Sequence, residues 1–203
     1  MKTPLILASS SPFRQQILKK LNLPFSSFSP DVDESHLCDE SPDKLVSRLS
    51  VLKAKAANDK FKEGLVIGSD QVAVHDGKIL GKPHTKENAI KQLQSFSGNK
   101  VKFLTGLCLY DIATNRYEVL VEPFNVHFKK LTLAQIEAYC DAETPYQCAG
   151  SFKSEGLGIC LFEKLEGSDP NSLIGLPLIR LTELLARFDV DVLLSQQKSM
   201  QVS

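Results

Sequence analysis

The sequence predicts an α/β fold in which a mixed central β-sheet is flanked by helices. Apolar runs of strand length alternate with helix-like segments in the first half of the chain, as in β-α-β-α arrangements. Two long strand-like runs then follow each other across a short polar turn, which predicts neighbouring antiparallel strands. With 203 residues, of which 42% are hydrophobic and 24% charged, the chain suits a single globular domain or two tightly joined lobes.

Composition excludes several classes of protein. Lys and Arg number 24, and Asp and Glu also number 24, so no excess positive charge would draw the chain to nucleic acid or to an anionic membrane. No apolar stretch approaches the roughly 20 residues of a spanning helix, and no signal peptide is recognisable. We therefore expect a cytoplasmic protein with reduced thiols. Its cysteines are expected to be small buried hydrophobes, with Cys108 and Cys160 inside strand-like runs.

The N-terminal quarter predicts two strands, each followed by a helix. Residues 5–8 form a continuous apolar run, and Ser11 followed by Pro12 is typical of a helix N-terminus. That helix is expected to end near Asn22, before a second strand over residues 25–29. The next helix is expected to start at Ser41-Pro42, with an apolar stripe formed by Leu45, Leu49, Leu52 and Ala56.

The centre of the chain contains its strongest strand signal. Residues 65–74 are expected to form a strand that turns at Asp76-Gly77 and returns through residues 78–80 as a hairpin. The elements expected next are a helix over residues 85–96 and strands over residues 101–110 and 117–128.

The last third of the chain is expected to contain one strand between two helices. Thr132 and Gln135 form a capping-box pair, which predicts a helix to about Cys140. A strand is expected over residues 157–162. Pro177 opens a last helix with an inward face formed by Leu178, Leu181, Leu184 and Leu185. We expect one domain over residues 1–194 and a frayed polar tail over residues 195–203.

Asp70 interrupts the apolar pattern of the strand expected over residues 65–74. A carboxylate in that position incurs a desolvation penalty unless it is paired, hydrogen-bonded or bound to a cation. Ser69, Asp70 and Gln71 place three consecutive polar residues where a strand favours alternation. A structural carboxylate that caps a bulge would explain Asp70 alone, but the cluster favours a functional site.

Arg14 lies in the first turn of the helix that begins at Pro12, where the helix dipole disfavours a cation. A bound anion would remove this conflict. The hydroxyl groups of residues 9–11 and the free amides of that turn could cradle a phosphate on which Arg14 closes. A solvated arginine beside an ordinary Ser-Pro cap explains the local pattern equally well.

Three more charged positions are ordinary when taken singly. Lys82 lies in a Gly-Lys-Pro corner after the hairpin, Glu34 follows the second strand, and Lys53 lies on the second helix. A corner presents a lysine rigidly, whereas most surface charges are simply solvated.

In combination, these motifs resemble the Maf family of nucleotide pyrophosphatases. The resemblance covers nearly the whole chain, and the motifs occur in the expected order. The matching segments are residues 5–14, 32–34, 68–72, 81–83, 149–152 and 175–177. The fold that this resemblance implies is the two-lobed fold shared by Maf proteins and inosine triphosphatases, with an active-site cleft.

The resemblance implies a metal-dependent hydrolase that cleaves a nucleoside triphosphate between its α and β phosphates. Asp70 matches the family's general base and, together with Glu34, would hold a divalent cation such as Mg²⁺ or Mn²⁺. The positions that match the family's substrate-binding residues are Ser9, Arg14, Glu34, Lys53 and Lys82. The implied partner is a small-molecule nucleoside triphosphate, with no nucleic acid polymer and no membrane, and a homodimer is an allowed assembly.

Phe13, Gln71 and Glu155 resemble the YceF-like branch of the family, which acts on 7-methylguanosine triphosphate. The sister branch, which acts on thymidine and uridine triphosphates, usually has a small residue, a threonine and a glutamine there. Methylation at N7 leaves guanine cationic, so an aromatic face and a carboxylate should prefer it over unmodified guanine. The branch has Trp where this chain has Phe13, which offers a smaller stacking face. Helix packing of Phe13 and solvation of Glu155 are the alternatives.

We therefore expect a house-cleaning hydrolase that converts 7-methylguanosine triphosphate to the monophosphate and pyrophosphate. The alternatives are a dTTP/UTP pyrophosphatase of the same family and a non-catalytic nucleotide-binding regulator of cell division. Asp70 argues against the regulator, because a buried carboxylate repels phosphate unless a metal intervenes. A purely structural protein would leave both Arg14 and Asp70 unexplained.

Overall fold

The computed structural model describes residues 3–200, with side chains up to residue 196. Its strands are β1 (Leu5–Ala8), β2 (Phe25–Phe28), β3 (Leu65–His75), β4 (Lys78–Leu80), β5 (Lys100–Asp111), β6 (Tyr117–Phe128) and β7 (Phe162–Gly167). They form a seven-stranded sheet in the order β2-β1-β3-β5-β6-β7, with β4 paired to β3. Strand β1 is parallel to β2 and β3, and the remaining pairs are antiparallel. The predicted mixed sheet is confirmed.

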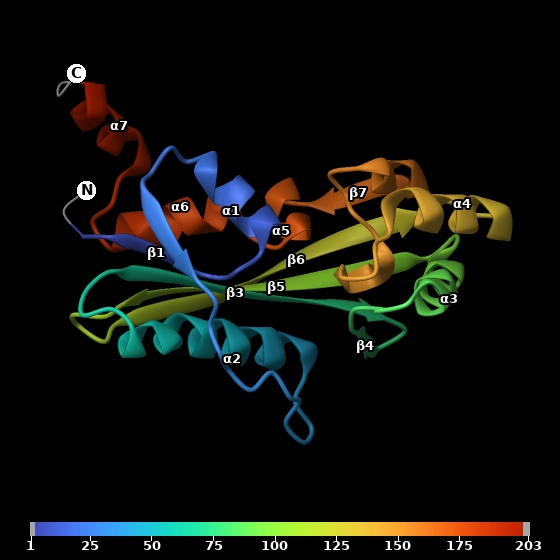
Figure 1. The fold of residues 1–203 in the computed structure, drawn as a ribbon, viewed down its shortest axis with the longest axis horizontal. Helices are drawn as coiled ribbons and strands as arrows, with labels where there is room; N and C mark the ends of the chain where they lie inside the picture. Colours follow the sequence, from blue (N-terminus) through green and yellow to red (C-terminus); the bar gives the residue numbers. More distant parts are fainter. Residues whose placement is uncertain (1–2, 201–203) are drawn as a thin grey trace.

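Helices cover both faces of this sheet. They are α1 (Pro12–Lys19), α2 (Pro42–Lys55), α3 (Lys86–Phe96), α4 (Leu133–Glu143), α5 (Pro170–Ile174), α6 (Leu178–Arg187) and α7 (Val192–Met200). Helix α2 lies along one face, and α1, α5 and α6 lie on the other (Figure 1). Helices α3 and α4 pack together at the far end of the long strands (Figure 1). No helix within residues 3–200 combines the length and the apolar character needed to cross a membrane.

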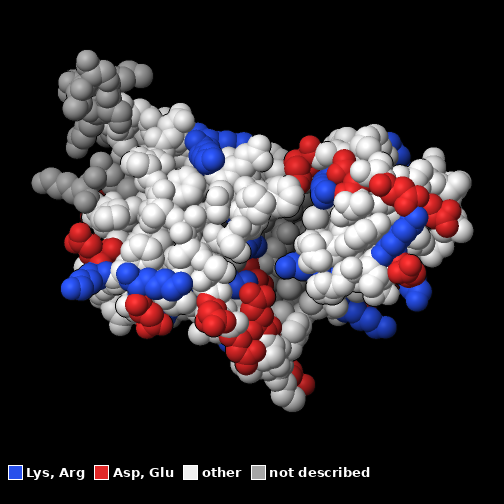
Figure 2. All heavy atoms as spheres, viewed as in Figure 1, with Lys and Arg blue, Asp and Glu red and all other residues white. Residues whose placement is uncertain are grey.

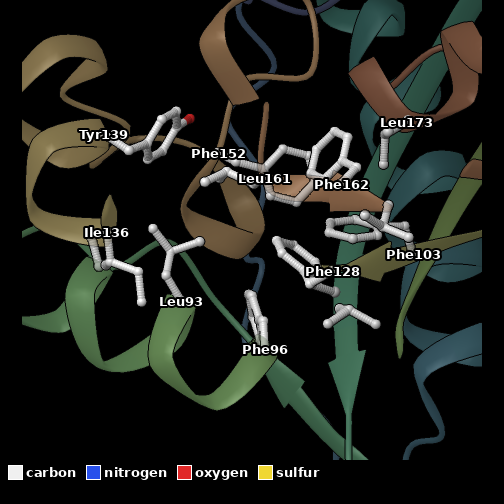
Figure 3. Close-up of a cluster of buried hydrophobic side chains, with 14 of the residues drawn as sticks. Leu93, Phe96, Phe103, Phe128, Ile136, Tyr139, Phe152, Leu161, Phe162 and Leu173 are labelled. Carbon is white, nitrogen blue, oxygen red and sulfur yellow. The ribbon is translucent and has the colours of Figure 1, made fainter. Parts of the chain in front are cut away.

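The apolar core is divided between two lobes that share the long strands β3, β5 and β6. One lobe contains β1, α1 and α6, with Leu7, Leu107 and Leu181 in its core. The distal lobe, formed by the far ends of the long strands with α3, α4 and β7, has an aromatic core (Figure 3). There the ring of Phe162 packs edge-on against Phe152 and Phe128 at centroid distances of 4.9 and 5.4 Å. Edge-to-face packing of this kind favours one defined arrangement of the rings.

Local signals in the sequence are confirmed at several helix ends and at the hairpin. The Ser11 side chain accepts a hydrogen bond from the backbone N–H of Arg14, and Thr132 forms a capping box with Gln135. The hairpin between β3 and β4 turns at Asp76 and Gly77, whose φ angles are 47° and 73°. Positive φ at both central residues is what a two-residue hairpin turn requires. Helix α1 ends at Lys19, earlier than expected.

The face on which α2 packs differs from the predicted stripe. Leu52 is 38% exposed, and Ala56 is half-buried in a short 3₁₀ turn, η1 (Ala56–Asp59). The residues that α2 buries are Leu45, Val46, Leu49, Ser50, Lys53 and Ala54. The reason is in the sheet, where Gly68 and Gly106 carry no side chain and let the helix backbone rest directly on the strands. The prediction that placed Leu52 and Ala56 inward was wrong.

The strand predicted over residues 157–162 is also wrong. Residues Leu157–Leu161 form a 3₁₀ helix, η3, and β7 begins at Phe162. The chain folds tightly before this point, because a Cβ atom on Gly158 would lie only 2.2 Å from the carbonyl oxygen of Lys153. In this geometry Cys160 is exposed, which contradicts its predicted burial. Cys108 lies buried in β5 as expected.

The C-terminal region contains two helices that we did not predict. Helix α5 precedes α6, and the four leucines predicted for the inward face of α6 are buried. Helix α7 (Val192–Met200) includes the first residues of the segment for which the sequence predicts a polar tail. The Gln196 side chain donates a hydrogen bond to the carbonyl oxygen of Leu21 at 3.0 Å, which ties α7 to the end of α1. Residues 201–203 lie outside the described residues.

Candidate active site

A cleft of ≈ 840 Å³ opens between the two lobes. The nine predicted site residues all line it: Ser9, Phe13, Arg14, Glu34, Lys53, Asp70, Gln71, Lys82 and Glu155. Figure 2 shows the hollow at the centre of the molecule, with Lys and Arg atoms inside it and Asp and Glu atoms along one lip. Most of these residues follow the carboxyl ends of β1 and β2 or lie midway along β3, a position where α/β sheets commonly bind ligands.

Lys53 and Asp70 meet because α2 packs closely on the sheet. A Cβ atom on Gly68 would lie 2.1 Å from the carbonyl oxygen of Ser50, and one on Gly106 would lie 2.3 Å from that of Val46. The helix therefore needs glycine at both positions. With α2 so close, Lys53 Nζ reaches Asp70 Oδ1 at 2.6 Å. The buried carboxylate is paired, as its desolvation requires.

The other polar residues of β3 point to the opposite face of the sheet, because side chains alternate along a strand. Ser69 Oγ lies 2.9 Å from the carbonyl oxygens of both Gly106 and Gly175. The Gln71 side-chain amide donates to the carbonyl oxygen of Ser172 at 2.8 Å and to Thr105 Oγ1 at 2.9 Å. Ser69 and Gln71 thus attach α5 and the Gly175 turn to the sheet, which explains three polar residues in succession.

Arg14 is held against the same turn. Its Nε donates to the Gly175 carbonyl oxygen at 2.8 Å, and Gly175 is in the left-handed region with φ 108°. Burial lowers the pKa of Arg14, while the nearby charges of Asp70 and Glu34 act in the opposite direction. Arginine keeps its proton in proteins. The side chain therefore offers a half-buried cation to the cleft, which Ser9 also lines. The Ser9 hydroxyl accepts a hydrogen bond from the backbone N–H of Ser11 at 3.2 Å.

Glu34 is held near Asp70 by Lys53, whose Nζ lies 2.8 Å from Glu34 Oε1. The loop that carries Glu34 is itself held by Arg48, which donates to both carboxylate oxygens of Glu40 at 2.6 and 2.7 Å and to the carbonyl oxygen of Ser35. The hydrogen bonds from Arg48 lower the pKa of Glu40 to about 2. Glu34 itself is exposed and faces the cleft.

Lys82 and Glu155 reach the cleft from the distal lobe. Both are exposed and belong to short connections, Lys82 after β4 and Glu155 before η3. Phe13 is half-buried at the start of α1. The cleft therefore combines cations and carboxylates from one lobe with a lysine and a carboxylate from the other.

The donor set fits a divalent cation that arrives with a substrate. Asp70 and Glu34 each place an oxygen within 2.8 Å of Lys53 Nζ, so the two carboxylates lie close together at the edge of the cleft. No group of three or more His, Cys, Asp or Glu side chains able to hold a metal occurs in the described part of the chain. Mg²⁺ usually binds one or two carboxylates and completes its shell with water and substrate phosphates. Two carboxylates match that mode.

Sequence reasoning missed several residues that build the site. Three features can be recognised only in the tertiary structure. They are the contact of Arg14 with the Gly175 carbonyl oxygen, the packing of α2 on Gly68 and Gly106, and the Arg48–Glu40 ion pair, which we call the Arg48–Glu40 latch. Asp169 is fully buried, caps α5 and accepts from the backbone N–H of Ile179 at 2.8 Å. The Asp169-Pro170 pair is a typical helix N-terminus and could have predicted α5.

Comparison with known proteins agrees with these motifs. The family model described as "Maf-like protein" matches residues 4–188. The chain is 67% identical over 199 residues to a protein of Pseudoalteromonas translucida named 7-methyl-GTP pyrophosphatase, with 98% of each chain covered. It is 57% identical over 198 residues to a protein of the same name from Colwellia psychrerythraea, again with 98% of each covered.

Among solved structures, the chain is similar to the Ham1 protein of Staphylococcus aureus, with 16% identity and a TM-score of 0.44. That similarity covers 63% of this chain and 72% of the other. The family match spans both lobes and every element that lines the cleft. The chain belongs to the family of Maf-like proteins.

Proposed function

We propose that this chain hydrolyses 7-methylguanosine triphosphate to 7-methylguanosine monophosphate and pyrophosphate. The observation that carries the proposal is the buried Lys53–Asp70 ion pair beside Glu34 and Arg14 in one cleft. This arrangement provides a carboxylate that could activate a water molecule and cations that could bind phosphate groups in the same cleft. Relatives named 7-methyl-GTP pyrophosphatase at 67% and 57% identity support the choice of substrate.

The phosphate chain would lie between the start of α1 and the middle of β3. Arg14 and Ser9 would contact it from one side, and Lys82 from the other lobe. Because Arg14 uses Nε on Gly175, its two terminal nitrogens would remain to contact an anion in the cleft. A preorganised and desolvated guanidinium binds phosphate more strongly than a solvated one does.

In the chemical step, Asp70 would accept a proton from the attacking water. Lys53 donates to Oδ1 of Asp70, and Asp70 lines the cleft, so Oδ2 would face the attacking water. The water oxygen bonds to the α-phosphorus as the bond from that phosphorus to the oxygen bridging to the β-phosphate breaks. Pyrophosphate leaves with the bridging oxygen, and the water proton passes to Oδ2.

Asp70 and Glu34 are the residues that would hold a divalent cation, Mg²⁺ or Mn²⁺. Such a cation, when bound, supplies positive charge that offsets the charge of the phosphates. Arg14, Lys53 and Lys82 supply the remaining positive charge from the protein.

The base would lie between Phe13 and Glu155. The ring of Phe13 is half-buried at the cleft and offers a face for stacking, and Glu155 offers a carboxylate to the cationic methylated base. Gln71 would not contact the base directly, because its side-chain amide already donates hydrogen bonds to Thr105 and Ser172. We assign Gln71 the role of fixing α5 at the edge of the cleft.

A substrate panel with one variant tests this proposal. Pyrophosphate release would be measured from 7-methyl-GTP, GTP, dTTP and UTP, with and without Mg²⁺ or Mn²⁺. We expect the highest kcat/KM for 7-methyl-GTP and loss of activity on chelation. Asp70→Asn should lower turnover at least about a hundredfold while the protein stays folded. Preferred hydrolysis of dTTP or UTP would contradict 7-methyl-GTP as the substrate. A folded, fully active Asp70→Asn variant would contradict the proposed role of Asp70.

A further inference from the structure

The loop that carries Glu155 is held from behind by Glu143, the last residue of α4. Glu143 Oε1 accepts a hydrogen bond from the backbone N–H of Leu157 at 2.8 Å. Its Oε2 lies 3.6 Å from Lys153 Nζ, and the same Nζ donates to the backbone carbonyl oxygen of Glu143 at 2.5 Å. One residue thus contacts both ends of the segment 153–157, with Glu155 at its centre.

We call these contacts of Glu143 with residues 153 and 157 the Glu143 clamp. Two more features complete this clamp. The hydroxyl of Tyr139, one turn earlier on α4, accepts a hydrogen bond from the backbone N–H of Lys153 at 3.0 Å. Burial raises the pKa of Tyr139, so the hydroxyl keeps its proton. Gly156 leaves space for the carboxylate, because a Cβ atom there would lie 2.6 Å from Glu143 Oε1. The clamp therefore depends on a glycine next to Glu155.

The clamp residues lie outside the cleft. Ser154 and Glu155 line it, whereas Tyr139, Glu143 and Gly156 are not among its lining residues. Glu155 is exposed, and Ser154 Oγ donates a long hydrogen bond of 3.4 Å to its carboxylate. An exposed carboxylate on a short loop has little to fix its position except the backbone that carries it. The position of Glu155 thus depends on the contacts that hold residues 153 and 157.

We infer that Glu143 is a positioning residue for substrate specificity, which holds the Glu155 carboxylate where it meets the base. This inference rests on the proposed function, because it needs Glu155 to contact the methylated base. Preorganised contacts contribute more to binding than those that must be ordered on association. Loss of the clamp should therefore weaken discrimination between methylated and unmodified guanine. The weakening should arise mainly from a higher KM for 7-methyl-GTP.

The first test compares kcat/KM for 7-methyl-GTP and GTP in a set of variants. Glu143→Ala removes the contacts to Leu157 and should lower the ratio about threefold to tenfold. Glu143→Gln should retain most of the ratio, since its amide oxygen can still accept from the Leu157 N–H. The matched control is Glu137→Ala, an exposed glutamate on the same helix, which should leave the ratio unchanged.

A double variant tests whether Gly156 acts through Glu143. Gly156→Ala should reproduce the loss of discrimination, because its methyl group would displace the Glu143 carboxylate. In the Glu143→Ala background the same change should add little, since the displaced group is gone. Fully additive effects of the two changes would contradict a shared clamp.

Hydrogen exchange tests the clamp without any substrate. The backbone amides of residues 154–157 should exchange faster in Glu143→Ala than in the wild type or in Glu137→Ala. If the wild type prefers 7-methyl-GTP and Glu143→Ala changes neither the ratio nor the exchange, the inference fails and the proposed function stands. If the wild type shows no such preference, the proposed function fails, and unchanged exchange would then also reject the clamp.

Discussion

Lys53 and Asp70 form an ion pair at the floor of the cleft, with Nζ and Oδ1 2.6 Å apart and both side chains about nine-tenths buried. The lysine comes from α2 and the aspartate from the middle of β3. Lys53 also contacts Glu34 at 2.8 Å, so one lysine holds two carboxylates together at the cleft. The same ion pair therefore contributes to the stability of the fold and lines the cleft.

The contribution of this pair to stability can be measured directly. Lys53→Met should lower the free energy of unfolding by roughly 3 kcal/mol, because it leaves Asp70 buried without a partner. The double variant Lys53→Met/Asp70→Asn should recover much of that loss, since no unpaired charge remains. Denaturant unfolding of the three proteins gives the comparison. A Lys53→Met variant no less stable than the double variant would show that the pair is not coupled.

Arg14 should matter more for binding than for stability. Arg14→Ala loses the hydrogen bond to Gly175 but also removes a cation with a high desolvation penalty, so the free energy of unfolding should change little. The affinity for a non-hydrolysable nucleoside triphosphate should fall about tenfold to hundredfold. Calorimetric titration measures this affinity, with Arg187→Ala, an exposed arginine bound to Glu118, as the control. Equal affinity of the two variants would place Arg14 outside the phosphate site.

Glu155 should determine the preference for the charged base. Glu155→Gln keeps the shape but removes the negative charge, so the ratio of kcat/KM for 7-methyl-GTP over GTP should fall about tenfold to hundredfold. Phe13→Ala should lower the same ratio by a smaller factor, because stacking also helps unmodified purines. Steady-state kinetics on both substrates test this. Retention of the full ratio by Glu155→Gln would remove Glu155 from the base site.

The close packing of α2 on the sheet predicts an intolerance of side chains at Gly68. Gly68→Ala places a methyl group against backbone atoms, 2.1 Å from the Ser50 carbonyl oxygen, and should destabilise the protein by at least about 2 kcal/mol. Gly81→Ala is the matched control, since no atom lies within 4 Å of a Cβ there. Thermal or denaturant unfolding distinguishes them. Similar stability of the two variants would contradict the observed packing.

The Arg48–Glu40 latch should persist into acid. Hydrogen bonds from Arg48 lower the pKa of Glu40 from 4.5 to about 2, so the pair contributes to stability above about pH 4.5 and loses that contribution as the pH falls through about 2. Carboxyl NMR should follow this titration directly. In Arg48→Ala the Glu40 midpoint should return toward 4.5. A Glu40 midpoint near 4.5 in the wild type would show that the latch is open in solution.

Much of the secondary structure follows from local rules in the sequence. Ser11 and Thr132 are recognisable caps, and Asp76-Gly77 is recognisable as a hairpin turn, because each depends on a few neighbouring residues. The segment 157–162 misled the same rules, since an apolar run there is consistent with either a strand or a tight 3₁₀ turn. The close approach of Gly158 to the Lys153 backbone favours the 3₁₀ turn. Hydrophobic periodicity cannot predict such a contact.

By itself, the sequence determined the class of fold, the order of most elements and a set of motif residues that share one cleft. The fold class and the order of elements follow from residue type and local spacing, whereas most of the motif residues were identified by their resemblance to the Maf family. Only the tertiary structure decided which groups face one another. Asp70 finds its partner 17 residues away, and Arg14 finds its acceptor 161 residues away. The first pairing depends on how closely α2 approaches the sheet, which Gly68 and Gly106 allow where β3 and β5 lie side by side. The second depends on α1 and the Gly175 turn meeting on the other face of the sheet.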